Sequence, residues 1–325
     1  MARKLTTRLT EFLNIDHPIL LAPMDKVAGG RLAAAVSAAG GLGLIGGGYG
    51  DRDWLEVALA DAGNQDVGIG FITWSAKQNP NVIDYALSRN PKALMVSFGD
   101  ADDVIRAAKE RNIPTLWQVQ RLAQAKQAIE AGADILVVQG QEAGGHGMDR
   151  GLTAFLPAVR DLAGPDQIIA AAGGIADGRG LASALMLGAD GVLMGTRFWA
   201  STEAVGSDAA KDKLVEMAGD DTIRTKVFDV ARNVDWPWYF TGRVGRNAFS
   251  DEWHNDIETL KSNAERERLR YDNADPDDFS TRVVIAGEAV DLIDAIEPAS
   301  AIIERTVAEA ISLLDQAPRF VTSTE

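Results

Sequence analysis

The chain has 325 residues, 46% of them hydrophobic and 24% charged, which suits one large globular unit with a smaller appendage. Its 32 Lys and Arg stand against 47 Asp and Glu, and the formal net charge of −15 argues against binding to nucleic acid or to anionic membrane surfaces. There is no cysteine, which excludes disulfides, thiolate nucleophiles and cysteine-ligated metal centres.

The N-terminal residues include basic side chains but no apolar run of the kind that a signal peptide has behind them. Farther along the chain, no apolar stretch approaches the ~20 residues that a membrane span needs. We therefore expect a soluble, cytoplasmic protein.

Eight short apolar runs recur before residue 200, each followed by polar or glycine residues and then by a helical pattern. The strands that they predict are 18–22, 42–45, 67–72, 93–97, 115–119, 135–139, 167–171 and 191–194. The helical spacing between them predicts helices at 31–39, 53–62, 82–88, 102–111, 121–131, 153–162 and 179–187. Continuous apolar strands that alternate with helices are typical of a parallel sheet covered by helices, and eight is the number of a closed (β/α)₈ TIM barrel.

An open, doubly wound sheet would show the same alternation, so closure needs a further argument. Two near-copies of one motif supply it: Ala-Gly-Ala-Asp at 131–134 precedes the sixth strand, and Leu-Gly-Ala-Asp at 187–190 precedes the eighth. In each copy the glycine is expected to end a helix and turn the chain into the next strand. Similar β/α units that lie two strands apart favour a symmetric barrel over an open sheet.

The pattern changes after residue 200. We expect a helix at 203–218, an irregular and aromatic stretch over 219–280, and two helices near 286–295 and 299–315. The predicted organisation is a barrel over 1–200, a smaller and mostly helical or irregular excursion over 201–280 that serves as a lid or substrate-binding part, and an outer ring of helices completed by 281–325.

Two pairs of residues, one Gly-Gly and one Gly-Thr, stand where barrels of this type recurrently bind phosphate, in the loops after strands seven and eight. Gly173 and Gly174 follow strand seven, and Gly195 with Thr196 follows strand eight. Glycine lets backbone N–H groups approach phosphate oxygens without interference from a Cβ atom. Tight turns would explain either pair, but not readily both at these two loops. We therefore predict a phosphate site there.

Glycines also cluster around the second strand, at 46–48. Their spacing does not match a dinucleotide-binding fingerprint. We expect them to make room for a flat ring system in the mouth of the barrel.

His146 is the candidate catalytic residue. It lies in a glycine-rich loop directly after strand six, at the end of the barrel where side chains that carry the chemistry are expected. His17 precedes the first strand, on the opposite face, and His254 lies in the late excursion. The titration range of an imidazole suits a general base near neutral pH. The alternative is a hydrogen-bonded loop histidine; a metal site is not expected, because no second ligand cluster accompanies it.

Three of these segments resemble the nitronate monooxygenase family, formerly called 2-nitropropane dioxygenases. They are Pro-Ile-Leu-Leu-Ala-Pro-Met at 18–24, Gln-Gly-Gln-Glu-Ala-Gly-Gly-His at 139–146 and Ala-Gly-Gly-Ile-Ala-Asp-Gly at 172–178. The stretch 188–198 is also similar, and the likeness covers 7–200 well and 243–247 more loosely. The Glu-Ala-Gly-Gly-His element is the most specific to the family. The chain departs from it at 25–27, Asp-Lys-Val, where many members have small residues.

The resemblance implies FMN, with its isoalloxazine ring across the barrel mouth and its phosphate on the two glycine loops. His146 matches the catalytic histidine of the family, as a base toward a nitroalkane or, when protonated, as a group that stabilises a nitronate. The resemblance also places Ala22, Pro23 and Met24 against the ring, and Gln118 and Gln139 on its polar edge or the ribityl chain. The other residues that it places around the cofactor are Gly144 and, at the phosphate, Gly173, Gly174, Gly195 and Thr196. On the substrate side it places Ser97 and Gly145.

The implied activity is the oxidation of nitronates by O₂ to a carbonyl compound and nitrite, with nitroalkanes as an open case. One alternative is an FMN-dependent NAD(P)H:quinone or enoyl-thioester reductase on the same barrel. A second alternative is a flavinless barrel that binds a phosphorylated metabolite. The physiological substrate, the use of NAD(P)H and the state of assembly, monomer or homo-oligomer, stay open at this point.

Overall fold

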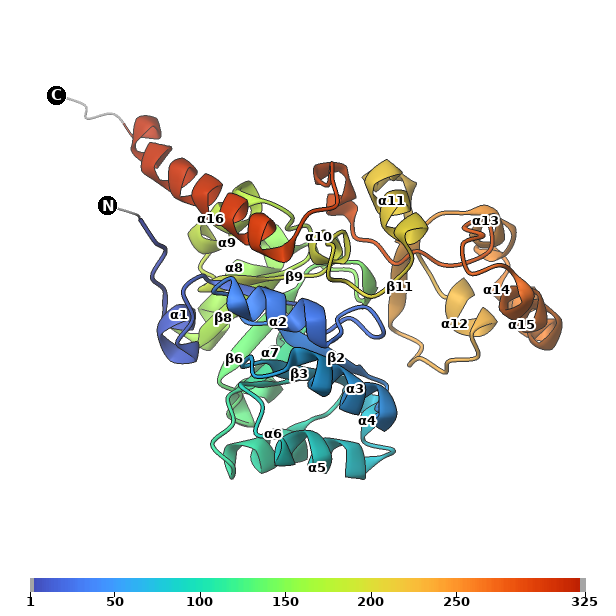
Figure 1. Cartoon of the computed structure of the whole chain (residues 1–325), viewed down its shortest axis with the longest axis horizontal. Coiled ribbons are helices and arrows are strands. Elements are labelled where there is room, and N and C mark those ends of the chain that lie inside the picture. Colours follow the sequence, from blue (N-terminus) through green and yellow to red (C-terminus); the bar gives the residue numbers. More distant parts are fainter. Residues whose placement is uncertain (1–2, 322–325) are drawn as a thin grey trace.

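Eight parallel strands form the barrel in the computed structural model, which describes residues 3–321 (Figure 1). Each strand pairs with the next along the chain, and the last pairs with the first. A parallel bridge between Leu20 and Leu42 joins the two remaining edges and closes the ring. The predicted (β/α)₈ barrel is confirmed. Its strands are β1 (Ile19–Leu21), β2 (Leu44–Gly48), β3 (Gly68–Ile72), β4 (Leu94–Ser97), β5 (Thr115–Val119), β6 (Ile135–Gln139), β8 (Ile168–Ala172) and β9 (Gly191–Met194).

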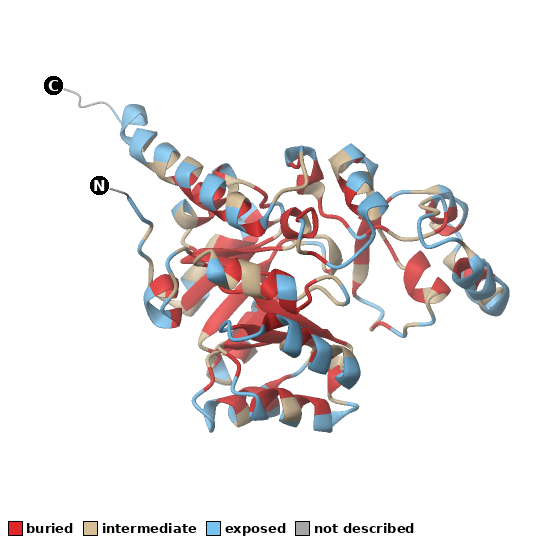
Figure 2. Cartoon of the chain, viewed as in Figure 1, coloured by how far each residue is buried: buried red, intermediate tan, exposed pale blue. Residues whose placement is uncertain are grey.

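A ring of helices covers the outside of the strands, which lie buried at the centre (Figure 2). The last helix of the ring, α16 (Ala299–Gln316), packs on α9 and α2. Gly178, the first residue of α9, allows the close approach to α16, because a Cβ there would lie 2.5 Å from the backbone nitrogen of Ala310. The ring consists of α2 (Gly30–Ala38), α3 (Arg52–Ala62), α5 (Pro80–Ser88), α6 (Asp102–Lys109), α7 (Leu122–Glu130), α8 (Leu152–Ala163), α9 (Gly178–Met186) and α16 (Ala299–Gln316).

The strands are apolar on both faces because each face is buried in a different layer. In β6, Ile135 and Val137 belong to the cluster inside the barrel, whereas Leu136 and Val138 belong to the layer beneath the helices. Helix α1 (Arg8–Leu13) contributes two leucines to the interior cluster, at the N-terminal end of the strands. The inward-facing positions at the opposite end of the strands are thus left to form a site.

The two glycines of the repeated motif both have the left-handed backbone that a helix-ending turn needs. Gly132 has φ +79° and Gly188 has φ +99°. Each motif then ends in an aspartate that ties its strand to the preceding one. Asp134 accepts hydrogen bonds from the backbone and hydroxyl of Thr115, and Asp190 accepts one from the backbone of Ile169 at 2.9 Å.

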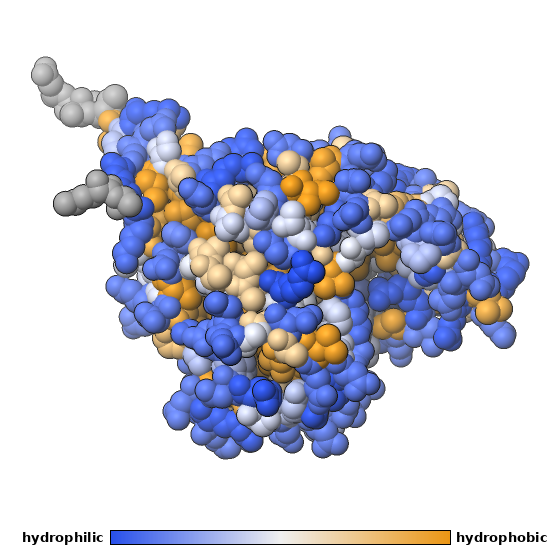
Figure 3. Space-filling view, viewed as in Figure 1, coloured by the Kyte–Doolittle hydropathy of each residue, from blue (hydrophilic) through white to orange (hydrophobic). Residues whose placement is uncertain are grey.

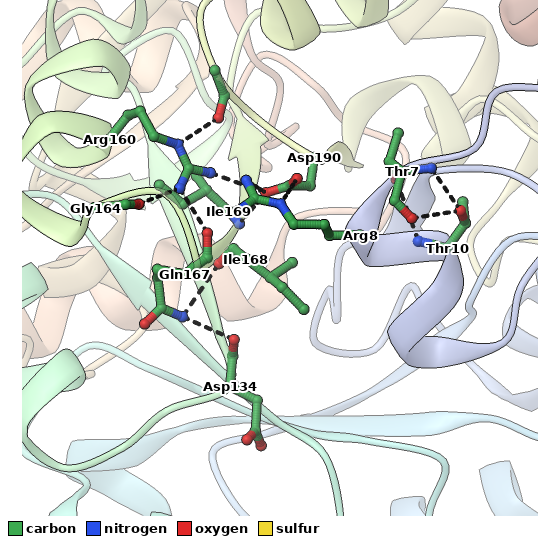
Figure 4. Close-up of polar contacts among 11 residues, drawn as sticks. Thr7, Arg8, Thr10, Asp134, Arg160, Gly164, Gln167, Ile168, Ile169 and Asp190 are labelled. Atoms are coloured by element: carbon green, nitrogen blue, oxygen red, sulfur yellow. Dashed lines mark hydrogen bonds and ion pairs between the residues drawn. The ribbon is translucent and has the colours of Figure 1, made fainter.

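Asp190 also pairs with two arginines at this end of the barrel (Figure 4). Arg8 donates to one carboxylate oxygen at 2.7 Å and Arg160 donates to the other at 3.0 Å, while the Asp190 side chain is only 8% exposed. Asp190→Ala leaves Arg160 Nη2 and the buried backbone N–H of Ile169 without their acceptor. We expect the free energy of unfolding to fall by about 3 kcal/mol in a denaturant titration. The control Asp251→Ala removes a half-exposed partner of Arg246 and should cost less than about 1 kcal/mol. Equal losses of unfolding free energy in the two variants would contradict a special stabilising role of Asp190.

The C-terminal part is more regular than expected. The stretch 219–280, expected to be irregular, contains two strands, four α-helices and a short 3₁₀ helix, and α11 (Asp208–Glu216) is shorter than the helix expected at 203–218. This part builds a small core of its own, with Phe228, Phe249 and Tyr271 in contact. The elements are β10 (Thr222–Thr225), α12 (Val227–Ala231), β11 (Thr241–Gly245), α13 (Ala248–Trp253), α14 (Ile257–Ser262) and α15 (Ala264–Asn273).

Two local predictions are wrong. The helix expected near 286–295 is only a 3₁₀ turn, Glu288–Leu292, and the chain beyond it is bound by Arg197 through the Ala295 carbonyl and Glu297. The glycines at 46–48 lie in β2 and do not line the cavity described below. They are needed for close packing, since a Cβ on Gly46 would lie 2.2 Å from the Met24 carbonyl oxygen.

The surface in view is mostly hydrophilic, with apolar side chains in separate patches (Figure 3). Within residues 3–321, no helix has both the length and the apolar character that a membrane crossing would require.

Candidate active site

A cavity of about 460 Å³ lies at the C-terminal end of the barrel strands. This volume falls within the range of sites for small molecules and cofactors. The structure brings all of the residues predicted for the site into its lining. They are Ala22, Pro23, Met24, Ser97, Gln118, Gln139, Gly144, Gly145, His146, Gly173, Gly174, Gly195 and Thr196.

Strand alternation explains why several of these side chains meet. Leu116 in β5 and Val137 in β6 point into the barrel, so the residues two positions later, Gln118 and Gln139, point the same way at its mouth. Ser97 follows Met95 in β4 by the same rule. The buried polar side chains therefore form a layer directly above the apolar interior.

The glycines after β8 form a cradle that a side chain would obstruct. Gly173 has φ +101° and Gly174 has φ +70°, and a Cβ on Gly173 would lie 3.0 Å from the Gly140 carbonyl oxygen. In the part of the chain that the structure describes, the amides of Gly173, Gly174 and Gly195 have no acceptor. Free amides in a glycine-lined pocket are what an anionic group such as a phosphate requires.

Three glutamines form a chain that ends on the backbone of His146. The side-chain amides of Gln118 and Gln120 donate to the Gln139 oxygen at 3.2 and 2.9 Å, and the Gln139 amide donates to the His146 carbonyl at 3.1 Å. Gln139 therefore helps to position His146. The side-chain oxygen of Gln118 remains available to a ligand.

His146 lies on a strand, whereas the sequence predicted a loop. Gly145–Gly147 form β7, which pairs with β11 in the antiparallel sheet β10-β11-β7 and places His146 opposite Gly242. The backbone of this segment is thus held on one side by β11 and on the other by Gln139. A side chain that is fixed in this way needs little reorganisation when a ligand binds.

The imidazole of His146 is held by a carboxylate and an indole. Nε2 lies 2.8 Å from Asp229 Oδ1, and the ring stacks on Trp236 with centroids 3.5 Å apart and planes at 6°. Burial is the largest influence on His146 and lowers its pKa below 6.5; the contact with Asp229 opposes this effect, and Arg232 and Arg224 reinforce it. The imidazole is therefore neutral near pH 7. With an ionised Asp229 as the acceptor, Nε2 carries the proton and Nδ1 keeps a lone pair.

An aromatic cluster walls the cavity beside His146. Trp236 makes edge contacts with Tyr49, Phe98 and Phe240, and its Nε1 donates to the Tyr49 hydroxyl at 3.0 Å. Phe98 has φ +61°, a backbone that aromatic residues rarely adopt and that often marks a functional site.

Sequence reasoning missed several residues of the site. Asp229 carried no local signal, because it lies 83 residues after its partner His146. Trp236 had a partial signal, since the aromatic run around it predicted a segment over the mouth of the barrel. Asp25, Tyr49 and Arg232 also line the cavity and were not predicted as site residues.

Comparisons with known proteins show which family the chain resembles. The family model described as nitronate monooxygenase matches residues 6–65 and 60–309. A nitronate monooxygenase of Neurospora crassa is 30% identical, over 92% of this chain and 90% of the relative. An indene-carboxyl-CoA dehydrogenase of Mycobacterium tuberculosis is 33% identical, over 70% of this chain and 64% of the relative. The solved structure of FabK from Thermotoga maritima superposes with a TM-score of 0.84 and 28% identity, covering 98% of this chain and all of that one.

Proposed function

The chain belongs to the nitronate monooxygenase family, which makes it an oxidoreductase, and we propose that it uses FMN to oxidise nitronates with O₂ to a carbonyl compound and nitrite. One observation carries the proposal. A neutral, doubly anchored imidazole shares a cavity with a cradle of free backbone amides. The first can handle a substrate proton, and the second can hold an anionic cofactor.

The residues of the cavity fit FMN. The amides of Gly173, Gly174 and Gly195 would hold the phosphate, which local donors must do in a chain of net charge −15. Thr196 accepts a hydrogen bond from the Gly287 amide at 3.0 Å, so its hydroxyl proton remains free to donate to the same phosphate.

The remaining contacts follow from the lining. The backbone of Ala22–Met24 would face the ring, and Gln118 would bond its polar edge or the ribityl chain. Gly144 would approach the cofactor from the other side, with Ser97 and Gly145 on the side of the substrate. FMN held in this way would supply the redox chemistry between the nitronate and O₂.

The barrel, the excursion and the final part of the chain take different roles in this proposal. The barrel of residues 1–200 would hold the cofactor, and the excursion of 201–280 would cover the substrate through Trp236. In the final part, α16 joins the outer ring, whereas the segment around Gly287 crosses the site next to Gly144.

His146 would act as a proton acceptor. Nδ1 has the free lone pair, and it would remove the α-proton of a neutral nitroalkane to give the nitronate. Asp229 would then stabilise the imidazolium at 2.8 Å. The lowered pKa disfavours the other expectation, a resting imidazolium that stabilises a nitronate. With a preformed nitronate there is no proton to remove, and His146 would only position the substrate.

The pH profile of nitroalkane turnover tests this protonation state. Only the neutral imidazole is a base, and burial favours the neutral form, so kcat/KM should rise with pH through a midpoint below 6.5 and then stay level. Asp229→Asn removes an influence that raises the pKa of His146, so the midpoint should move to lower pH. A midpoint above 6.5, or one that Asp229→Asn moves upward, would contradict the assignment.

Nitrite release with O₂ consumption, measured with an alkyl nitronate, tests the proposed activity itself.

The dehydrogenase relative from Mycobacterium tuberculosis supports a second candidate, a reductase that uses NAD(P)H or acts on a thioester. Rapid NADPH oxidation with a quinone or an enoyl thioester, without nitrite formation, would favour that candidate. A colourless protein that cannot be reconstituted with FMN would favour the flavinless barrel.

A further inference from the structure

The antiparallel sheet β10-β11-β7 has two faces, and the imidazole of His146 lies on only one of them. His146 is paired with Gly242, and a Cβ on Gly242 would lie 3.6 Å from the imidazole Nε2. Because side chains alternate along a strand, the next residue in β7, Gly147, faces the opposite side of the sheet. With no side chain at Gly147, this side of β7 has room for a side chain from another strand.

Two arginines occupy this opposite face. By the same alternation Arg243 of β11 faces away from His146, and Arg224 of β10 is its cross-strand partner. Arg224 reaches past β11 to β7, since a Cβ on Gly147 would lie 2.6 Å from its Nη2. The same Cβ would lie 3.1 Å from Oε1 of Gln139, the residue that supports the His146 backbone. The sheet therefore separates a guanidinium from the imidazole.

The two arginines differ in whether their polar groups have partners. Arg243 forms an ion pair with Glu288, with 2.6 Å between Nη2 and Oε1. It also donates to the Gln141 carbonyl and the Thr222 hydroxyl, both at 3.0 Å. In Arg224 all three guanidinium nitrogens are shielded from solvent, and none has a hydrogen-bond partner within residues 3–321. Buried polar groups almost always have partners, so this exception indicates a role other than packing.

The guanidinium of Arg224 stays charged in this position. Burial and, next, the neighbouring Arg243 lower its pKa to about 10, against the opposite influence of three carboxylates. Each of these carboxylates is bound by another donor, and the pairs are Glu288 with Arg243, Asp149 with Arg121, and Glu142 with the Leu152 amide. Arg224 is thus a cation over the whole range in which an imidazole titrates. A buried charge without a bound partner lowers the stability of a fold.

Three charged groups act on the protonation of His146 besides its burial. Asp229, on α12, is hydrogen-bonded to Nε2 and favours the imidazolium. Arg232, which follows α12, and Arg224, behind β7, disfavour it. Arg232 also acts on Asp25, a carboxylate of the same cavity. The charge of Arg224 makes a second positive charge, on the imidazole, unfavourable.

We propose that Arg224 is a positioning residue of the active site, whose unpaired positive charge behind β7 keeps the imidazole of His146 in its neutral, basic form. Arg224 is not among the residues that line the cavity, so it acts through the sheet and not on a ligand. This inference rests on the proposed function only where it takes the neutral imidazole to be the base of the reaction. It extends the site to a residue on the far side of the sheet.

The titration of His146 itself tests this role without relying on turnover. The chain has only three histidines, so their imidazole NMR signals can be followed against pH in the purified full-length protein, and His146→Asn identifies the signal of His146. Arg224→Met removes a like charge, so the midpoint of His146 should move to higher pH by about 0.5 unit or more. Arg224→Gln should do the same, and Arg224→Lys, which keeps the charge, should move the midpoint less.

Two controls separate the effect of Arg224 from a general change of charge. His17 precedes β1, at the other end of the barrel strands, and its midpoint should not move in any of these variants. Arg106→Met removes an exposed charge on α6, on the outside of the barrel, and should leave His146 unchanged. A His146 signal that titrates at the same pH in the wild type and in both neutral variants, or in none of them, would overturn the proposal.

Denaturant unfolding of the same variants distinguishes a charge effect from a structural one. Because the guanidinium has no bound partner, Arg224→Met should leave the free energy of unfolding unchanged or raise it. A marked loss of stability together with an unchanged His146 midpoint would show that Arg224 is structural.

Turnover then separates this inference from the proposed function. With a neutral nitroalkane, kcat/KM of Arg224→Met should be about 3-fold lower on the acid side of the pH profile and no lower on the alkaline plateau. A His146 midpoint that depends on Arg224, in a protein that forms no nitrite, would support the role of Arg224 and overturn the proposed activity. Nitrite formation with a midpoint that does not depend on Arg224 would overturn the positioning role alone.

Discussion

Replacement of His146 by asparagine is expected to lower kcat/KM for a neutral nitroalkane by about 10²- to 10⁴-fold while FMN stays bound. The asparagine amide can still donate to Asp229, but it has no basic nitrogen in place of Nδ1. Turnover of a preformed nitronate should fall much less, because no proton has to be removed. Nitrite formation from the two substrate forms and the ratio of flavin to protein are the quantities to measure.

His254→Asn is the matched control for this experiment. His254 follows α13, outside the cavity lining, so its replacement should leave both activities within about twofold of the wild type. Unchanged nitroalkane turnover in His146→Asn would show that the imidazole is not the base. Equal losses for both substrate forms would indicate a positioning role alone.

Gly173→Ala should weaken FMN binding by about 10- to 100-fold. The substitution forces a Cβ onto a residue with φ +101° and places it 3.0 Å from the Gly140 carbonyl oxygen and 3.1 Å from the Ala143 nitrogen. The loop has to shift, and its free amides would then no longer point to one phosphate. Backbone strain of this kind costs about 1–3 kcal/mol. The dissociation constant is measured by adding FMN to the apoprotein and following its fluorescence.

Gly164→Ala separates strain from cofactor binding. Gly164 also has a left-handed backbone, φ +76°, but a Cβ there meets nothing within 4 Å, and the residue lies at the end of α8 away from the cavity. Both variants should lose thermal stability, and only Gly173→Ala should lose FMN affinity. A Gly173→Ala protein with normal FMN affinity would show that the phosphate is held elsewhere.

The barrel could be predicted from the sequence because its signals are local. A strand buried on both faces is a continuous apolar run, and a glycine that ends a helix precedes the next strand, as at Gly132 and Gly188. The ends of these strands then point to the site, since inward-facing positions such as Gln118 and Gln139 follow the apolar ones by two. The cavity lining that was predicted consists of residues of this kind and of the loops after them.

The rest of the site depends on contacts between distant segments. His146 reads as part of a glycine-rich loop until β11, almost 100 residues later, supplies a strand to pair with. Asp229 lies on a short helix and Arg232 directly follows it, and the position of this helix is set by that same sheet and by a small separate core. Similarly, the segment 286–295 has helical spacing but forms only the short 3₁₀ turn Glu288–Leu292, and Arg197 binds the chain beyond it through Ala295 and Glu297. Such pairings leave no periodic pattern in the sequence.

The visible spectrum of the purified protein, followed by anaerobic addition of an alkyl nitronate, tests the central claim most directly. A flavin spectrum that bleaches on addition of the nitronate, and returns with nitrite formation when air is admitted, is the predicted result. A flavin that stays oxidised with the nitronate but is rapidly bleached by NADPH would contradict the account.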